Sequence, residues 1–299
     1  MLDLHVHSSY SDGSETPETL VALAKAAHVR AIALTDHDNA YGIPDFLAAC
    51  REAEFLGIAG VEVSANVESG TLHILGLGID AGNEALCDAL TEVLEGRDER
   101  NVRIVEKLQD LGFNITYDEV LEMAGEDVVG RPHFAQVMVA RGWVESVEEA
   151  FSRYLEKGQP AYVDRFRFQP EEAIALIRGA GGVPVMAHPM SVTEDFAELR
   201  EVVAKLTDAG LRGIEAYYNG HSPETTLECL RLAKRNGLLV TGGSDFHGQS
   251  VKPGIRIGIG NGSLFVPDRL LEPLLAEINP KGCFIPKITT SQNKEVRNE

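Results

Sequence analysis

Short apolar runs alternate with segments of helical periodicity along the first 80 residues. Four such runs predict strands, because each is short and is bounded by polar or glycine-containing turns: LDLHVHS (2–8), AIALTDHD (31–38), IAGVEVSANV (58–67) and TLHILGLGID (71–80). TPETLVALAKAAH (16–28) and IPDFLAACREAEFLG (43–57) predict helices, the first with Thr16 as N-cap and Pro17 at its first position. This alternation is typical of parallel βα units with helices on both faces of a sheet.

A different pattern occupies residues 82–160, which contain few strand signals and predict helical segments separated by glycine-containing turns. The α/β alternation then resumes with the helix PEEAIALIRGAG and the strands VPVMAHP, GIEAYY and LLVTGGSDFHG. We therefore predict one barrel-like or doubly wound α/β domain formed by residues 1–81 and 161–288. Residues 82–160 form a helical insert in it, and residues 289–299 a polar tail.

The composition narrows the class of protein. The chain of 299 residues is 44% hydrophobic and long enough for a large α/β domain. It has no apolar stretch of the about 18 residues that suggest a membrane span, and its four cysteines are scattered without a CxxC pair. We therefore expect a cytoplasmic protein with reduced thiols and no membrane contact. The net charge of −19 disfavours long polyanions as ligands. It does not exclude a small phosphorylated substrate, because metal cations can reverse the local sign.

Most of the histidines lie at the ends of predicted strands, where parallel α/β folds place their functional sites. His5 and His7 are two residues apart in the first strand, so both imidazoles point the same way and can share one ion. A single histidine in an apolar strand is usually a hydrogen-bonded core residue. Together, however, so many imidazoles and carboxylates need partners, and metal ions supply them. The candidates are His5, His7, Asp12, Asp36, His37, Glu62, His73, His188, Asp245 and His247, whereas His28 and His221 are not expected to take part.

The segments HVHSSYSDG, LTDHD, GVEVSA, LHILG, MAHP and GGSDFHG together resemble the polymerase-and-histidinol-phosphatase (PHP) family of metal-dependent phosphoesterases. The resemblance covers nearly the whole chain. It is closest to the stand-alone subgroup that acts on nucleotides, the AMP or 3′,5′-nucleoside bisphosphate phosphatases, some with 5′-3′ exoribonuclease activity on short RNA. It implies a distorted (β/α)7 barrel with three divalent metal ions, which could be manganese, zinc or iron.

The resemblance also implies how the ligands are divided among the three ions. The first ion would be held by His5, His7, Glu62 and Asp245. Glu62 would bridge to a second ion, held also by His73 and His188. The third would be held by Asp12, His37 and His247. Asp36, next to His37, would instead orient an imidazole.

The reaction expected at such a trinuclear site is hydrolysis of a phosphomonoester by a metal-bound hydroxide. The ions would neutralise the transferring phosphoryl group, so that no serine or cysteine nucleophile is required. Asp245 or His188 is expected to assist the leaving oxygen as the catalytic acid, and the sequence leaves that choice open. Asp12 is expected to contact substrate as well as metal.

The insert contains GRPHFAQVMVARG, which predicts a phosphate-binding helix start. We expect the Arg131 guanidinium, the His133 ring and the amide of Phe134 to bind substrate phosphate; the ordinary alternative is a capped helix with an exposed arginine. The charged run GRDERNVRIVEKLQ (96–109) is interpreted as a solvated helix face.

A nucleotide phosphatase is the function these residues favour, with a small phosphorylated substrate and no protein partner inferred. Within the enzymes, a 5′-3′ exoribonuclease acting on short RNA 5′ ends and a histidinol-phosphate phosphatase are the alternatives. The helical insert favours the nucleotide subgroup over the second of these. A non-catalytic binding module is disfavoured, because every expected ligand position is filled.

Overall fold

The computed structural model describes residues 1–125, 129–164 and 166–286. At its centre lies a sheet in which seven strands follow one another in chain order, and a short eighth strand pairs with the third. The bounds of the strands are β1 Leu2–Val6, β2 Ala31–Leu34, β3 Leu56–Ala65, β4 Leu72–Leu77, β5 Val183–Met186, β6 Gly213–Tyr218, β7 Leu239–Gly243 and β8 Cys283–Phe284. The predicted tail, 289–299, lies outside the described residues.

The sheet is nearly closed into a barrel, because β1 also contacts the segment that follows β7. Val6 forms a bridge with Phe246. The amide of His7 donates to the carbonyl of Phe246 at 2.9 Å, and the amide of Asp245 donates to the carbonyl of His5 at 2.9 Å. These bonds join the two ends of the seven-strand path. The fold is a distorted (β/α)7 barrel, which confirms the predicted fold class.

Strand β4 departs from the expected parallel arrangement. It pairs antiparallel with both β3 and β5, whereas β1–β2, β2–β3, β5–β6 and β6–β7 are parallel. Only residues 66–71 separate β3 from β4, and so short a link cannot make the crossover that parallel pairing needs. The expectation of parallel βα units throughout is therefore wrong here. As a consequence, β4 begins at the edge of the sheet where β3 ends.

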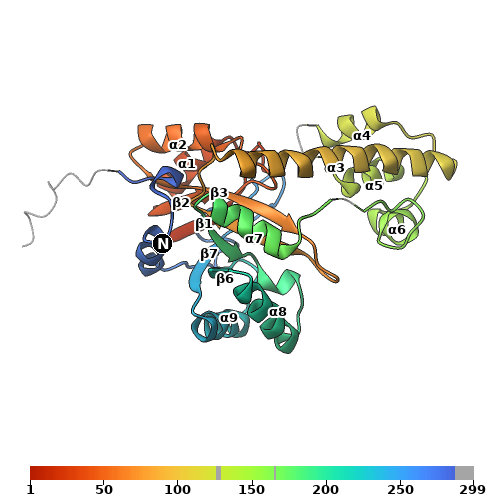
Figure 1. The fold of residues 1–299 in the computed structure, drawn as a ribbon. Helices are drawn as coiled ribbons and strands as arrows, with labels where there is room; N and C mark the ends of the chain where they lie inside the picture. The colour runs from red at the N-terminus through yellow and green to blue at the C-terminus, as the bar shows by residue number, and fades with distance from the viewer. Residues whose placement is uncertain (126–128, 165, 287–299) are drawn as a thin grey trace, which may run out of the picture.

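Helices cover the outside of this barrel (Figure 1). Their bounds are α1 Pro17–Ala26, α2 Ile43–Glu52, α7 Pro170–Gly179, α8 Phe196–Asp208, α9 Pro223–Asn236 and α10 Leu271–Leu275, with single turns η2 Pro189–Ser191, η3 Asp268–Leu270 and η4 Pro280–Gly282. One hydrophobic cluster packs Ile32 of β2 against Leu20 of α1 and Phe46 of α2. A second cluster contains the next residue along β2, Ala33, together with Leu274 of α10. Both faces of the sheet are thus buried, as its apolar strands require.

The insert forms a separate lobe to one side of the barrel (Figure 1). Its elements are α3 Glu84–Asp110, α4 Tyr117–Ala124, α5 Arg131–Ala140, α6 Val147–Ala150 and the π-helical turn η1 Phe151–Leu155. Leu90 near the start of α3 packs in the barrel cluster, whereas Leu108 near its end packs in the insert's own cluster. Because α3 belongs to both bodies, the domain boundaries at residues 82 and 160 remain predictions. Among the described residues, no helix combines the length and the apolar composition needed to cross a membrane.

Candidate metal centre

Nine histidine, aspartate and glutamate side chains meet at one edge of the barrel. Val6, between His5 and His7, packs in the cluster beneath the helices, so the two imidazoles point to the other side. His73 joins them although it lies near the start of β4, because that strand runs antiparallel to its neighbours. The remaining members follow β1, β2, β5 and β7 or lie on β3: Asp12, His37, His188, Asp245, His247 and Glu62.

Three groups of these residues bring their ligand atoms within 4.8 Å of one another. The first consists of His5, His7, Glu62 and Asp245, which is the set implied for the first ion. The second consists of His37, Glu62 and His73. The third consists of His7, Asp12, His37 and His247. The geometry therefore places His7 and His37 in two of these groups each, whereas the family pattern assigned each histidine to one ion.

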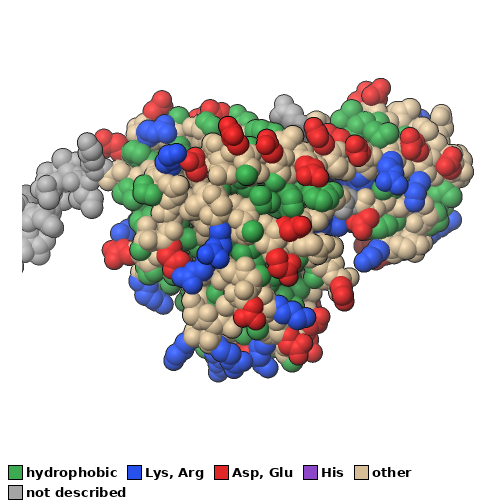
Figure 2. Space-filling view, in the orientation of Figure 1, with side chains coloured by type: hydrophobic (Ala, Val, Ile, Leu, Met, Phe, Trp, Pro, Cys, Tyr) green, Lys and Arg blue, Asp and Glu red, His purple; other side chains and the backbone are tan. Residues whose placement is uncertain are grey.

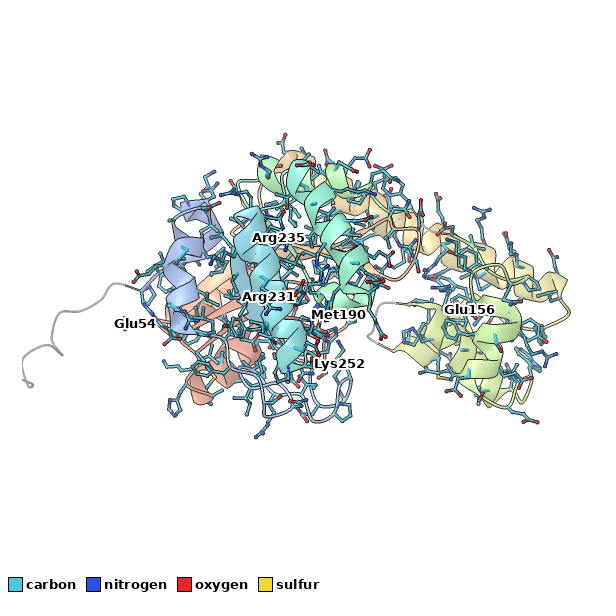
Figure 3. The ribbon with its side chains drawn as sticks, turned by 90° about the horizontal axis from the view of Figure 1, so that it is seen from below. Glu54, Glu156, Met190, Arg231, Arg235 and Lys252 are labelled. Carbon is cyan, nitrogen blue, oxygen red and sulfur yellow. The ribbon has the colours of Figure 1, made fainter. Side chains whose placement is uncertain are left out.

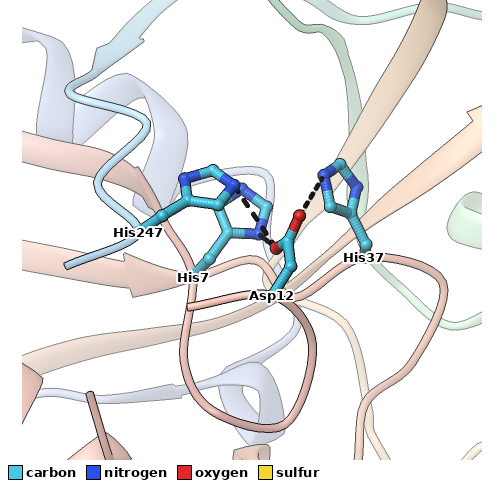
Figure 4. A group of neighbouring side chains, drawn as sticks. All are labelled: His7, Asp12, His37 and His247. Atoms are coloured by element: carbon cyan, nitrogen blue, oxygen red, sulfur yellow. Dashed lines mark ion pairs between the residues drawn. The ribbon is translucent and has the colours of Figure 1, made fainter. Parts of the chain in front are cut away.

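Asp12 lies between the imidazoles of the third group (Figure 4). Its Oδ1 is 3.3 Å from Nε2 of His247 and 3.6 Å from Nδ1 of His7. The other oxygen, Oδ2, is 3.7 Å from Nε2 of His37. Its pKa lies well below the usual range, because these histidines outweigh the opposing effect of burial. Asp12 is therefore an ionised carboxylate that faces imidazoles through both oxygens.

Glu62 is the centre of the whole arrangement and is fully buried. Its Oε1 lies 2.9 Å from Nδ1 of His73 and 2.9 Å from Nε2 of His188. Its Oε2 lies 3.1 Å from Nε2 of both His5 and His7. Burial opposes ionisation, but the surrounding imidazoles hold the pKa of Glu62 well below its usual range. A charged carboxylate shared in this way is what bridging between ions requires.

The donor set fits divalent metal ions better than it fits a hydrogen-bond network. His5 faces Glu215 through Nδ1 and Glu62 through Nε2, yet a neutral imidazole has only one N–H to donate. Both ring nitrogens of His7 and Nδ1 of His37 are buried and make no hydrogen bond with any described residue. Two ligand atoms bonded to one ion at about 2.0–2.2 Å lie about 3.3–3.6 Å apart at the tetrahedral angle, close to the separations found here. Imidazole and carboxylate without thiolate suit zinc, iron or manganese.

Three further residues whose roles sequence reasoning missed contact the candidate ligands. Glu215, in the middle of β6, accepts hydrogen bonds from Nδ1 of His5 at 3.2 Å and from the amide of His188 at 2.7 Å. Oδ2 of Asp245 accepts from the hydroxyl of Tyr218 at 2.9 Å and from Nζ of Lys252 at 2.7 Å. A glutamate inside the otherwise apolar strand GIEAYY was the one signal that could have pointed to Glu215.

Asp36 has a different role from the one expected. Its carboxylate accepts hydrogen bonds from the amide and hydroxyl of Ser8 and from the hydroxyl of Ser11, and it forms no hydrogen bond with an imidazole among the described residues. It therefore fixes the turn that presents Asp12.

The backbone is strained where the chain leaves two strands, with φ +24° at His188 and +54° at Asp245, a conformation that non-glycine residues rarely adopt.

Two cavities open at this edge. The smaller, of about 330 Å³, lies over the cluster and is lined by His37, Glu62, His73, His188, Asp245 and Lys252 among others, including His221, which was not expected to take part. The larger, of about 610 Å³, lies between the β3–β4 hairpin and the insert. Figure 2 shows the surface hollowed between the barrel and the insert lobe. Thr71 and His73 line both cavities, so the two adjoin each other.

The structure separates the three residues of the predicted phosphate grip. Arg131 lines the larger cavity, where its guanidinium donates to the carbonyl of Leu155 at 3.0 Å. His133 and Phe134 are not among the described residues that line it. Nδ1 of His133 accepts from the amide of Gly130 and so caps its own helix, and the ring of Phe134 is fully buried in the insert core. Substrate binding by these three residues remains a prediction.

Comparison with known proteins agrees with the geometry. The family model described as PHP domain matches residues 3–164. The chain is 35% identical over 247 residues to the 3′,5′-nucleoside bisphosphate phosphatase of Chromobacterium violaceum, a match that covers 82% of this chain and 87% of that protein. It is also 35% identical over 250 residues to a 5′-3′ exoribonuclease of Salmonella typhimurium, covering 82% and 84%.

A solved structure from Bifidobacterium adolescentis, described as a metal-dependent phosphoesterase, superimposes with a TM-score of 0.75 at 31% identity and covers 93% of this chain and 96% of that one. The chain belongs to the PHP family, and it is a metal-dependent phosphoesterase. The resemblance inferred from its histidine motifs is thereby confirmed.

Proposed function

We propose that this phosphoesterase hydrolyses the phosphomonoester of a nucleotide, AMP or a 3′,5′-nucleoside bisphosphate. The observation that carries the proposal is the pair of adjoining cavities, one over the candidate metal cluster and one lined by arginines of the insert. A cluster alone could serve any phosphate ester. The adjoining cavity of about 610 Å³ has room for the rest of a nucleotide. The likeness to a nucleoside bisphosphate phosphatase supports the same substrate class.

Three divalent ions are proposed to be held by His5, His7, Asp12, His37, Glu62, His73, His188, Asp245 and His247. When bound, they would supply the Lewis acidity that activates water and neutralises a phosphoryl group. The chain's own residues hold the ligands rigid: Glu215 orients His5, and Lys252 and Tyr218 fix Asp245. Asp12 faces the same space and is proposed to contact substrate.

His188 and Asp245 are the proposed catalytic acids. Asp245 accepts two hydrogen bonds on Oδ2, one of them from the Lys252 ammonium, and these favour its ionised form. His188 lines the cavity over the cluster, and its Nδ1 lies 2.7 Å from the hydroxyl of Ser191. Both residues line the cavity over the cluster and both are proposed metal ligands, so the choice between them stays open.

A 5′-3′ exoribonuclease acting on short RNA is the second candidate function. It is favoured by the likeness to the Salmonella enzyme and by the open side of the larger cavity. A single-stranded 5′ end could lie there against the arginine side chains that line the cavity. In Figure 3, Met190 and Lys252 lie on the barrel and Glu156 lies across from them on the insert lobe.

A substrate panel tests the proposal. The manganese-loaded protein would be assayed for kcat/KM with AMP, adenosine 3′,5′-bisphosphate, histidinol phosphate and a 5′-phosphorylated short RNA. We expect nucleotides to be preferred by about 100-fold, which corresponds to about 2.7 kcal/mol of transition-state binding. A preference for histidinol phosphate would refute the substrate class while leaving the metal centre in place. A preference for the RNA would select the second candidate.

A further inference from the structure

We propose that Lys252 is a further catalytic residue, whose ammonium group binds the phosphate of the substrate at the metal cluster. The inference deepens the proposed function and rests on it, because it assumes that a phosphomonoester is hydrolysed over the cluster. Lys252 lies in the turn that follows His247, outside every motif from which the site was predicted.

The cavity over the cluster contains one lysine and no arginine among the described residues that line it, and that lysine is Lys252. The arginines near the site line the larger cavity instead. Two of them, Arg97 and Arg100, correct the interpretation of the run 96–109 as a solvated helix face. A phosphate ester that enters the smaller cavity therefore meets the ammonium of Lys252 in addition to any ions that the cluster holds.

The ammonium of Lys252 lies beside the carboxylate of Asp245, on the side away from the imidazoles. Its Nζ donates to Oδ2 of Asp245 at 2.7 Å. The other oxygen, Oδ1, is 3.5 Å from Nε2 of His5 and 3.3 Å from Nε2 of His7. One carboxylate thus separates the lysine from two proposed metal ligands. This placement brings the ammonium next to the space where the phosphate of the substrate would be bound.

Holding Asp245 does not account for the whole of this lysine. Burial opposes ionisation of Asp245, but His5, His7 and Lys252 hold its pKa well below its usual range. The hydroxyl of Tyr218 donates to the same Oδ2 at 2.9 Å, so this oxygen has a hydrogen-bond partner besides the lysine. A divalent ion held by Asp245 would offset the same negative charge. The ammonium would then be free to interact with an anion.

The ammonium group also has donors to spare. A lysine carries three N–H donors, and among the described residues only Asp245 accepts a hydrogen bond from Nζ of Lys252. The side chain is 40% exposed, so it is not enclosed in the core. Hydrogen bonds from an ammonium to phosphate oxygens are charge-assisted and therefore strong.

The turn that carries Lys252 is held by its own hydrogen bonds. The amide of Lys252 donates to the carbonyl of Gly248 at 2.9 Å, and the side chain of Gln249 accepts from the amide of Gly254 at 3.1 Å. Gly248 has φ +93° and lies so close to the side chain of Ser14 that a Cβ at this position would clash with it. The lysine is thus presented from a fixed backbone at the edge of the cavity.

The role that follows is electrostatic. During hydrolysis a bond forms between phosphorus and the oxygen of water, and the bond between phosphorus and the leaving alcohol breaks. Lys252 would form no covalent bond. Its ammonium would bind the phosphoryl oxygens and stabilise their negative charge through the transition state.

The test compares Lys252→Met, which removes the charge, with Lys252→Arg, which keeps it. Tyr218→Phe is the reference for a loosened Asp245, because it removes the other hydrogen bond to Oδ2. Lys234→Met is the matched control, since Lys234 is exposed on α9 and lines neither cavity in the part of the chain that the structure describes.

Three quantities would be measured for each full-length protein. The first is kcat/KM for AMP and for para-nitrophenyl phosphate at saturating manganese. The second is the dissociation constant of inorganic phosphate from the manganese-loaded protein, measured by calorimetry. The third is the affinity of the substrate-free protein for manganese.

We expect Lys252→Met to lower kcat/KM for both esters, and the affinity for inorganic phosphate, by about 10- to 100-fold, as the loss of a hydrogen bond between charged groups implies. Its affinity for manganese should stay close to that of the wild type. Lys252→Arg should keep part of the phosphate affinity, because it keeps the charge but changes the geometry of the donors. Lys234→Met should resemble the wild type in all three measurements.

The inference would be overturned if Lys252→Met lost manganese affinity, as Tyr218→Phe would if it loosened Asp245, and regained full activity and phosphate binding at saturating manganese. Lys252 would then act only through Asp245. A loss confined to AMP would also overturn it, since the lysine would then contact the nucleoside. If the wild type hydrolysed para-nitrophenyl phosphate but not AMP, the proposed nucleotide function would fail. Phosphate binding that depends on Lys252 would still support the inference in that case, and phosphate binding independent of Lys252 would refute it.

Discussion

The carboxylate of Glu215 lies 3.2 Å from Nδ1 of His5 and leaves Nε2 of that imidazole facing Glu62 at 3.1 Å. Both glutamates are fully buried. The pair fixes the tautomer of His5, because an Nδ1–H that donates to Glu215 makes Nε2 the free lone pair. One residue in β6 thus orients a proposed metal ligand in β1 that lies 210 positions away in the sequence.

Replacing Glu215 by Gln should therefore weaken metal binding without removing any ligand. We expect about 10- to 100-fold lower affinity, the usual cost of losing a partner behind a ligating histidine. The measurement is activity as a function of manganese concentration: the midpoint should move to higher metal, and the activity at saturating metal should recover largely. A loss that no metal concentration restores would assign Glu215 a direct part in the reaction.

His7 belongs to two of the three groups, and its ring nitrogens make no hydrogen bond with the described residues. His7→Ala should lower kcat/KM by about 1,000-fold or more, because metal-assisted hydrolysis depends on intact ligation. Circular dichroism should show an unchanged fold. His28→Asn is the matched control, since His28 is exposed and Asn tolerates its left-handed backbone of φ +56°. If the His7 variant kept activity within tenfold of wild type, the ligand assignment would be wrong.

Removal of metal should destabilise the protein as well as inactivate it. The cluster gathers six histidines and three carboxylates from most strands of the barrel, so ions bound there link distant segments of the folded chain only. A ligand at 100 times its dissociation constant stabilises the folded state by about 2.7 kcal/mol. Differential scanning calorimetry should show Tm falling on EDTA treatment and recovering with manganese. An unchanged Tm together with lost activity would mean that the ions bind too weakly to stabilise the fold.

Replacing Arg100 by Met should leave the protein equally stable or make it more stable. The change removes a buried charge that has no carboxylate partner among the described residues, and it keeps the apolar stem of the side chain. We expect an increase in the free energy of unfolding of about 1 kcal/mol in the absence of nucleotide. Urea denaturation measures it, with Arg103→Met as the control. A marked loss of stability would show that the hydrogen bonds from Arg100 to Asn101 stabilise the fold more than burial of the charge destabilises it.

Local patterns along the chain predicted much of this molecule. The strands carrying His5, Glu62 and Asp245, and the helix start at Pro17, follow from apolar runs and capping residues, which act within a few residues of one another. The helical insert was recognisable for the same reason. The end of α2 was not predicted correctly: the helix was expected to reach Gly57 but ends at Glu52. Leu56 and Gly57 belong to β3 instead, where they pair with β2 and β8.

What the sequence by itself determined is the kind of chemistry: imidazoles and carboxylates spaced so that a folded sheet would collect them. What the tertiary structure decided is which of them lie close enough to share an ion and which residues surround them. His73 reaches the cluster only because β4 runs antiparallel, and Glu215 and His5 meet across 210 positions of the chain. Helical periodicity predicted that Arg97 and Arg100 lie near one face of α3, but it did not predict which way that face would point. Because α3 packs on both the barrel cluster and the insert cluster, that face is turned toward the larger cavity.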